Sequence, residues 1–406
     1  MKTESAKINS WSIIQHNMRQ YSMFIVLLLI MGTSHFLTNG LFLTPRNLTN
    51  LFLQTGYIAV LAIGMVMVII GGHIDLAIGS VVAFCAAIAA YLQVRLGYGT
   101  LVVWVVALLI GMAAGGIQGT LVAYVGLPAF IVTLAGMMFF RGVVLGITRG
   151  NTIAPFAESF RALGSGYLPD FLGNFTIRVT SFGKPIDITL DIATVVVGAV
   201  LILILIINQV MKRNKRIHYG FEVLGLGFFL VQLLVLCLLI AFFTFSLASY
   251  KGIPYTIIVV GAFVVLYAYL SNRTKIGRNI YAVGGNALAA ELSGINVKFT
   301  TFMMFVSMGF LSAVSGMLFA ARMNSAAPSH GTAFELEAIA ASYVGGVSAK
   351  GGIGTVTGAV IGALIIASIN NCMSLLNAAV WQQYMIKGVV LVIAVLFDIM
   401  TRKKKG

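Results

Sequence analysis

Residues 272–295 read NRTKIGRNIYAVGGNALAAELSGI, a polar stretch in a chain that is otherwise mostly apolar. Apolar segments flank it, at 259–270 and at 299–319. Lys275, Arg278 and Lys298 give the stretch a positive charge, and short cytoplasmic loops of membrane proteins carry an excess of Lys and Arg. If the flanking segments cross a membrane, this stretch is therefore cytoplasmic.

The second half of the stretch predicts a short exposed helix. Asn286 can cap its start, residues 287–292 are good helix formers, and Gly294 can adopt the left-handed conformation that ends a helix. Leu288, Leu292 and Ile295 recur at a spacing that places them on one face. Two turns of helix are not stable alone in water, so this apolar ridge is expected to dock onto something.

The composition is that of an integral membrane protein. Of the 406 residues 59% are hydrophobic and only 9% are charged, against about 25% charged in soluble domains. The net charge of +15 does not indicate nucleic-acid binding, because the basic residues cluster between apolar spans and form no basic, aromatic-interleaved domain. Three cysteines in apolar runs read as small buried hydrophobic residues.

Hydropathy predicts an all-α, polytopic bundle of about 10–12 transmembrane helices, since a span needs about 20 apolar residues. The candidate spans are 21–37, 51–71, 76–94, 100–124, 129–148, 190–211, 221–247, 254–270, 299–321, 335–347, 352–376 and 381–400. The tenth is too short to cross unaided. With twelve spans, the basic N-terminal segment, the loop at 212–216 and the basic C-terminus share the cytoplasmic side.

Two glycine-rich interruptions follow spans that head inward. Broken segments at corresponding places in two halves of a transporter point to the transport pathway. We take these glycines as structural: Gly71, Gly72, Gly345, Gly346, Gly351, Gly352 and Gly354.

Polar residues at membrane depth are functional candidates because they are costly there. His73 and Asp75 lie at the first break, where Asp75 either caps the third span or contacts solute. Glu335 and Glu337 open the tenth span near the outer face, as helix-start residues or as contacts for hydroxyl groups of a passing solute.

Further polar positions lie inside or near the spans. Asn370 and Asn371 lie within the eleventh span, where bonding between helices is the commoner use of an amide. Together with His73, Asp75, Glu335 and Glu337 they form the candidate translocation pathway. Arg141 either reaches the interface or pairs, and Lys387 is expected to pair with a carboxylate that the sequence does not identify.

No catalytic constellation is present, and the five histidines show no metal-ligand spacing. The phosphate-binding pattern Gly-x-x-x-x-Gly-Lys-Ser/Thr is absent as well. Any ATP that drives this protein must be bound by another subunit.

Four stretches resemble permease subunits of ABC importers for monosaccharides, in particular the xylose and multiple-monosaccharide type. They are GGHIDLAIGS at 71–80, GLPAFIVTLAGMMFFRG at 126–142, GRNIYAVGGNALAAELSGINV at 277–297 and ELEAIAASYVGGVSAKGGIGTVTGAVIGAL at 335–364. Two departures stand out: Glu291 occupies a position where many members have Arg, and Ala77 one where many have Ser.

The resemblance implies that residues 272–298 form the coupling loop that seats on the ATPase subunit. Its contact residues would be Arg278, Tyr281, Gly284, Gly285, Asn286, Leu288, Ala290, Glu291, Leu292, Ser293, Gly294 and Ile295. It also implies a permease core similar to that of the vitamin B12 importer type, with an inserted helix pair.

The expected partners are an ABC ATPase that binds ATP and magnesium, a periplasmic or lipid-anchored sugar-binding protein, a second permease copy and membrane lipid, but no nucleic acid. No cofactor or metal is expected in this chain, which would not be an enzyme. The expected location is the bacterial cytoplasmic (inner) membrane, with both termini cytoplasmic.

These expectations divide the chain into eight parts. They are a cytoplasmic N-terminal segment (1–20), a first helical half (21–148), an extracytoplasmic loop region (149–189), the inserted transmembrane pair (190–250), a helix leading to the coupling loop (254–271), the coupling loop (272–298), a second helical half (299–401) and a basic cytoplasmic tail (402–406). The loop region offers a landing surface for a partner outside the membrane, since long loops are usually functional or disordered.

Three rival functions remain at this point. A related permease for branched-chain amino acids or nucleosides shares parts of the pattern. An ion-coupled secondary transporter would work without an ATPase. A membrane scaffold would show no substrate-dependent ATP hydrolysis in its assembled complex.

Overall fold

The structure is a computed structural model, and it describes residues 10–181, 184–221, 223 and 225–403. Residues 1–9 of the predicted N-terminal segment and 404–406 of the basic tail lie outside the described ranges. The chain forms two compact units. The first unit comprises Met1–Ser22, Leu43–Thr49 and Tyr167–Pro254; the second comprises Met23–Phe42, Asn50–Gly166 and Tyr255–Gly406.

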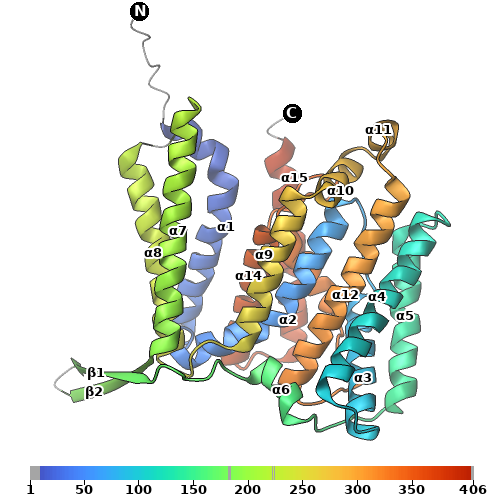
Figure 1. Ribbon diagram of the computed structural model, residues 1–406, viewed down its shortest axis with the longest axis horizontal. Helices are drawn as coiled ribbons and strands as arrows, with labels where there is room; N and C mark the ends of the chain where they lie inside the picture. The colour runs from blue at the N-terminus through green and yellow to red at the C-terminus, as the bar shows by residue number, and fades with distance from the viewer. Residues whose placement is uncertain (1–9, 182–183, 222, 224, 404–406) are drawn as a thin grey trace, which may run out of the picture. The chain divides into compact units, whose positions relative to one another are not determined.

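The second unit is helical, with α10 and α11 at one end and α6 at the other (Figure 1). It contains the later part of α1 (Ser10–Leu37), most of α2 (Pro45–Ile70), and α3 (Ile78–Ala90) with its π-helical turn η1 (Tyr91–Arg95). It also contains α4 (Thr100–Ala123), α5 (Ala129–Thr148), α6 (Glu158–Ser165), α9 (Tyr255–Arg273), α10 (Lys275–Gly285), α11 (Ala287–Leu292), α12 (Val297–Met323), α13 (Phe334–Val344), α14 (Val356–Leu375) and α15 (Val380–Lys403).

Helix α2 forms the centre of this unit. Nearly every side chain from Ile58 to Ile70 is buried, in one cluster with residues of α12, α13 and α14. A helix that is apolar on all sides is stable only where protein surrounds it, and α2 has that composition.

Glycines let α4 and α12 pack at backbone distance. Gly111, Gly115 and Gly119 are spaced four residues apart on α4 and form a stripe against α12. A Cβ at Gly115 would lie 2.2 Å from the carbonyl oxygen of Phe305, and one at Gly309 would lie 2.1 Å from that of Gly111. Small residues in this pattern let membrane helices approach to backbone distance.

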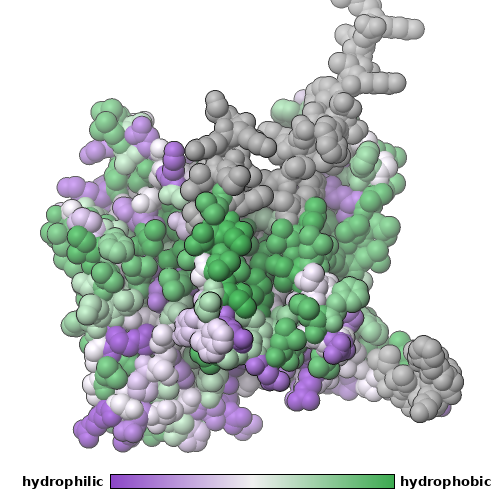
Figure 2. Space-filling model, turned by 180° about the vertical axis from the view of Figure 1, so that it is seen from behind, coloured by the Kyte–Doolittle hydropathy of each residue, from purple (hydrophilic) through white to green (hydrophobic). Residues whose placement is uncertain are grey.

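The described residues include nine helices long and apolar enough to cross a membrane, and two shorter apolar helices at Met23–Leu37 and Val380–Ile393. On the second unit, Figure 2 shows apolar residues across the middle of the visible face and hydrophilic residues toward its lower edge. Exposed apolar side chains such as Leu101, Met138 and Val265 suit contact with lipid. The predicted polytopic helical fold is confirmed.

Helix α13 is the short tenth span that the sequence indicated. Its 11 residues reach about 16 Å, half of the roughly 30 Å hydrocarbon core. It begins at Phe334, whose ring stacks on Tyr57 with centroids 4.8 Å apart. Since Tyr57 is near the midpoint of α2, α13 begins beside the middle of α2, and the position of Glu335 and Glu337 relative to the outer face stays a prediction.

The first unit contains a β-hairpin and two long helices, α7 (Ile192–His218) and α8 (Leu226–Ala248). Strand β1 (Asn174–Ser181) pairs antiparallel with β2 (Lys184–Asp191). This hairpin lies mostly in the segment predicted as an extracytoplasmic loop region, although alternating Thr, Ile and Val residues in both strands are a strand signal.

The carboxylate of Asp191 begins α7 by accepting the N–H groups of Ala193 and Thr194 at 3.3 and 3.1 Å. The predicted loop at 212–216 is in fact the end of α7, where basic side chains favour the helix dipole.

A matched pair of glycines tests the close packing of α4 on α12. We expect Gly115→Leu to lower the free energy of unfolding by about 2–3 kcal/mol, because its Cβ would strike backbone that cannot give way. Gly116→Leu is the control, since its nearest neighbour is a side-chain atom 3.8 Å away. Thermal unfolding of the detergent-solubilised proteins measures both, and equal midpoints would contradict the packing described.

Candidate functional site

The predicted coupling loop is two helices. Thr274 caps α10 by accepting the N–H of Gly277 at 3.3 Å, and Ile280 and Val283 are buried on the inner face of this helix. The sequence analysis treated residues 272–285 as loop. A capping Thr followed by apolar residues three apart was the signal that could have revealed the helix.

Helix α11 forms as predicted. The side-chain oxygen of Asn286 accepts the N–H of Ala289 at 3.0 Å. Gly294 has a φ of +82°, and the N–H of Ile295 donates to the carbonyl of Ala290 at 3.0 Å, which closes the helix C-terminus. Because both ends are capped within the chain, the helix keeps its shape without a partner.

Two leucines of α11 form an exposed apolar pair. Leu288 is 68% exposed and Leu292 is 83% exposed, whereas Ala290 is buried and Ile295 is half-buried. The predicted three-residue ridge is therefore narrower, with Ile295 partly turned inward. The two leucines do not pack back onto the rest of the chain.

Helix α10 touches the end of α2 through backbone atoms. A Cβ at Gly284 would lie 1.6 Å from the carbonyl oxygen of Ile70, so only glycine fits. The same oxygen of Ile70 accepts the N–H of Gly352 at 2.8 Å. Three segments far apart in sequence therefore meet at one carbonyl group.

Tyr281 adds a second link between α10 and the second glycine break. Its hydroxyl donates to the carbonyl of Gly354 at 2.9 Å. Burial raises the pKa of Tyr281, against a smaller lowering by its hydrogen bond with Ser271, so the hydroxyl keeps the proton it donates.

Most of the predicted structural glycines occupy conformations that favour glycine. Positive φ angles occur at Gly72 (+85°), Gly346 (+84°), Gly351 (+81°) and Gly352 (+71°). Gly345 instead lies where a Cβ would be 2.3 Å from the carbonyl of Gly358, and a Cβ at Gly71 or Gly354 would meet side chains of Met304, Val347 or Ile70. The breaks are tight turns beside α10.

The polar residues of the first break have separate surroundings. Asp75 is buried, and its carboxylate accepts the N–H of Ala77 at 2.8 Å, just before α3 begins at Ile78. Asp75 therefore shapes the turn that leads into α3, but it is not the N-cap: that position is Ala77, which has no side-chain cap hydrogen bond. His73 is half-buried beside Phe305, with ring centroids 6.0 Å apart.

Arg141 and Glu335 lie near the segment that precedes α13, which includes Pro328 and His330. The guanidinium of Arg141 donates to the carbonyls of Pro328 and His330 at 2.9 and 2.7 Å. Glu335 is half-buried, and its carboxylate lies against Gly79 at the start of α3. Arg141 is thus paired with backbone oxygen.

Glu337 is the partner of Lys387 that the sequence could not identify. The Lys387 Nζ and the Glu337 Oε1 are 2.6 Å apart, which joins α13 to α15. Asn370 on α14 donates from Nδ2 to the same oxygen at 3.2 Å. A largely buried charged pair needs such partners, because leaving either charge alone would be costly.

The neighbouring amide, Asn371, is directed elsewhere. Its Nδ2 donates to the Oε1 of Gln54 on α2 at 3.3 Å, which agrees with the use of amides to join helices. Of the six predicted pathway residues, the structure thus brings Glu337 and Asn370 together through a hydrogen bond. The other four each have different neighbours: His73, Asp75, Glu335 and Asn371.

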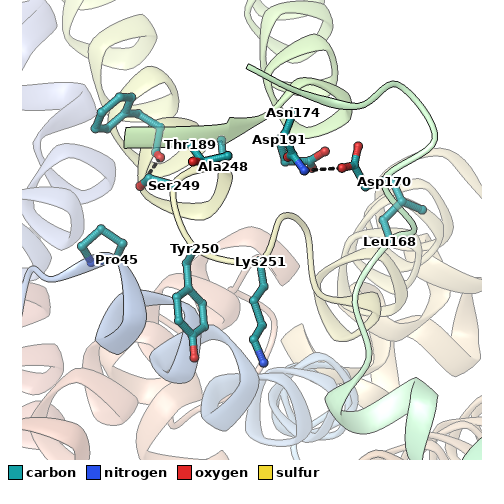
Figure 3. Close-up of a pocket in the computed structure, with 11 residues that line it drawn as sticks. Pro45, Leu168, Asp170, Asn174, Thr189, Asp191, Ala248, Ser249, Tyr250 and Lys251 are labelled. Atoms are coloured by element: carbon teal, nitrogen blue, oxygen red, sulfur yellow. Dashed lines mark hydrogen bonds between the residues drawn. The ribbon is translucent and has the colours of Figure 1, made fainter. Parts of the chain in front are cut away.

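The first unit holds an open cavity of about 580 Å³ beside the hairpin (Figure 3). Asn174 donates to the carboxylate of Asp170 on one side, at 2.5 Å. In Figure 3, Tyr250 and Lys251 point away from that pair, and the ammonium of Lys251 lies 5.5 Å from the ring centre of Tyr167. Asn174 is thus paired with Asp170, and Lys251 lies over the ring of Tyr167.

Among the described residues, no three His, Cys, Asp or Glu side chains are grouped as a metal site. The geometry is that of a polytopic α-helical membrane protein with broken helices and a short exposed helix, α11, beside them. The chain belongs to the family described as branched-chain amino acid transport system / permease component, whose pattern matches residues 47–395.

Full-length relatives agree with this family. The chain is 37% identical over 388 residues to the xylose transport system permease protein XylH of Haemophilus influenzae, covering 96% of this chain and 98% of the relative. It is 34% identical to XylH of Escherichia coli K12, covering 96% and 93%. It is 31% identical to the ribose import permease protein RbsC of E. coli K12, covering 94% of each. No solved structure matches significantly.

Adjacent glycines in α10 test its contact with Ile70. We expect Gly284→Ala to lower the free energy of unfolding by about 1–3 kcal/mol, since the new methyl group must displace the Ile70 carbonyl. Gly285→Ala should be close to neutral, because a Cβ there meets nothing within 4 Å. Thermal unfolding in detergent compares the two. A Gly284→Ala protein as stable as the Gly285→Ala protein would rule out the contact.

Proposed function

We propose that this chain is the membrane-spanning permease subunit of a bacterial ABC importer that moves a monosaccharide into the cytoplasm. The family and the full-length relatives, named for xylose and ribose, support a sugar as the cargo. The family description mentions branched-chain amino acids, but the relatives named above are sugar permeases, so that alternative is not favoured.

The observation that carries the proposal is the exposed leucine pair on α11. Leu288 and Leu292 lie on a helix whose ends are capped, so the pair is presented in a fixed geometry. Exposed, preformed apolar ridges on a helix suit a complementary groove, because little ordering entropy is lost on docking. The proposed groove belongs to an ATPase subunit, with the exposed Arg278 and Glu291 at its polar rim.

The contacts of α10 provide a path from that ATPase to the membrane. A displacement of α11 moves α10, and α10 cannot move without moving Ile70 and the 351–354 turn, because backbone touches backbone there. We therefore assign α10 the role of transmitting the ATPase cycle to the two glycine breaks.

In this proposal the chain itself is non-catalytic and carries no cofactor. ATP and Mg²⁺ bind to the separate ATPase subunit, and a sugar-binding protein delivers the cargo from outside. A second permease copy would complete the pathway within the inner membrane. Both termini and α10–α11 would be cytoplasmic, which the basic end of α7 and the basic C-terminal residues support.

Removing the leucine pair tests the docking role. Burying one leucine side chain is worth roughly 1.5–3 kcal/mol, so Leu288→Ala with Leu292→Ala should weaken ATPase docking by up to about 3–6 kcal/mol. Alanine preserves helix propensity, so α11 itself should remain. Co-purification of the detergent-solubilised complex measures docking, and sugar uptake should fall in parallel.

The matched control is Leu101→Ala with Leu109→Ala, which removes two exposed leucines from α4 instead. This control should retain the ATPase. The docking role is wrong if the α11 double variant retains its ATPase with the stoichiometry and affinity of the unaltered permease.

A further inference from the structure

A small cavity of about 100 Å³ lies between α13, α14 and α15 at the Glu337–Lys387 pair. Its polar lining consists of Glu337, Asn370, Tyr384 and Lys387, and the remaining lining is aliphatic. Leu336 and Tyr384, also in the lining, are 48% and 52% exposed, so the cavity is open to the surface of the second unit. Its volume exceeds the roughly 10–15 Å³ that one water needs, so it admits more than one hydroxyl-sized group.

Two buried acceptors in this cluster have no hydrogen-bond partner among the described residues. They are Oε2 of Glu337 and Oδ1 of Asn370. The side chain of Glu337 is only 8% exposed. The amide orientation of Asn370 is fixed by chemistry, since a carboxylate oxygen bound to Lys387 can only accept, and Nδ2 must be the donor. Unpaired buried acceptors are costly, so this arrangement calls for a donor from outside the chain.

The place of the cavity in the fold favours the transport pathway. Glu337 lies in the first turn of α13, which begins beside the middle of α2, and α13 is the short helix next to the second glycine break. Solute sites of transporters lie near the midplane, at the ends of such discontinuous helices. Ala333, which precedes α13 and lines the cavity, has a φ of +64°, a conformation that non-glycine residues rarely adopt.

The charges select the class of solute. Glu337 and Lys387 neutralise each other, so the cavity attracts neither a cation nor an anion. The residues that line it hold two buried, unpaired acceptors beside an ammonium group that carries further donor hydrogens. Neighbouring hydroxyl groups on an uncharged carbon chain or ring can donate to both acceptors and accept from the ammonium group.

We propose that this cavity is a hydroxyl-binding site for the sugar in transit, with Glu337 and Asn370 accepting from its hydroxyl groups and Lys387 donating to them. The proposal rests on the proposed import function and assigns it a contact within the membrane. The site holds the hydroxyl-bearing edge of the sugar. A water molecule offers the same donors, so the test must separate a transported hydroxyl from a resident water.

The test is uptake of labelled xylose by the complete complex in liposomes, at saturating sugar-loaded binding protein. Asn370→Leu removes one free acceptor and leaves the ion pair in place, so turnover should fall about tenfold, the worth of one hydrogen bond. The triple variant Glu337→Met, Asn370→Leu, Lys387→Met replaces the three proposed sugar contacts with apolar side chains of similar length and should lose uptake almost completely. Gln93→Leu is the control, as it removes another buried amide with an unpaired oxygen, near Thr100.

A structural or water-filled cluster gives the opposite result. Replacing a buried ion pair with apolar residues is often neutral or stabilising, so the triple variant would then fold and transport like the unaltered complex. Retained turnover in the triple variant overturns the proposal. Size-exclusion profiles and ATPase co-purification identify variants that fail to fold, and Asn370→Leu, with its ion pair intact, then decides. Failure of the unaltered complex to import any monosaccharide would instead refute the proposed function.

Discussion

The carbonyl oxygen of Ile70 is the contact on which the rest of the structure depends. It ends the most buried helix of the second unit, accepts the N–H of Gly352, and lies where any side chain at 284 would collide with it. Backbone against backbone leaves no soft side chain to absorb a displacement, since interiors are packed to crystal density. Movement of α10 is therefore movement of both glycine breaks, which is the property that a coupling element needs.

A second constraint is the cost of polar groups at membrane depth. Asp75 is satisfied by the backbone at the start of α3, Arg141 by two carbonyls, and Asn371 by Gln54. These groups join elements that apolar packing alone would leave free to slide. The Glu337–Asn370–Lys387 cluster differs, because two of its acceptors remain unpaired beside an open cavity. This difference is the reason for assigning the cluster to a solute in the proposal above.

Local features were predictable from sequence because their causes are local. The cap at Asn286, the helix at 287–292 and the left-handed Gly294 each depend on a few adjacent residues. The start of α13 beside the middle of α2 and the partner of Lys387 were not predictable, because they arise from contacts between segments 50 or more residues apart. Helix α10 was missed although Thr274, Ile280 and Val283 carried its signal, and the hairpin strands were missed in the same way. The glycine breaks were recognised, but their meeting at Ile70 required the fold.

The energy source of transport tests most directly whether an ATPase drives this protein. Liposomes that contain the permease and its ATPase, with ATP enclosed and the loaded binding protein outside, should accumulate labelled xylose. We predict that accumulation stops when ATP or the ATPase is omitted and continues when ionophores collapse all ion gradients. Accumulation by the permease alone, driven by an ion gradient and indifferent to ATP, would contradict the central claim that α10 and α11 transmit the work of an ATPase to the membrane.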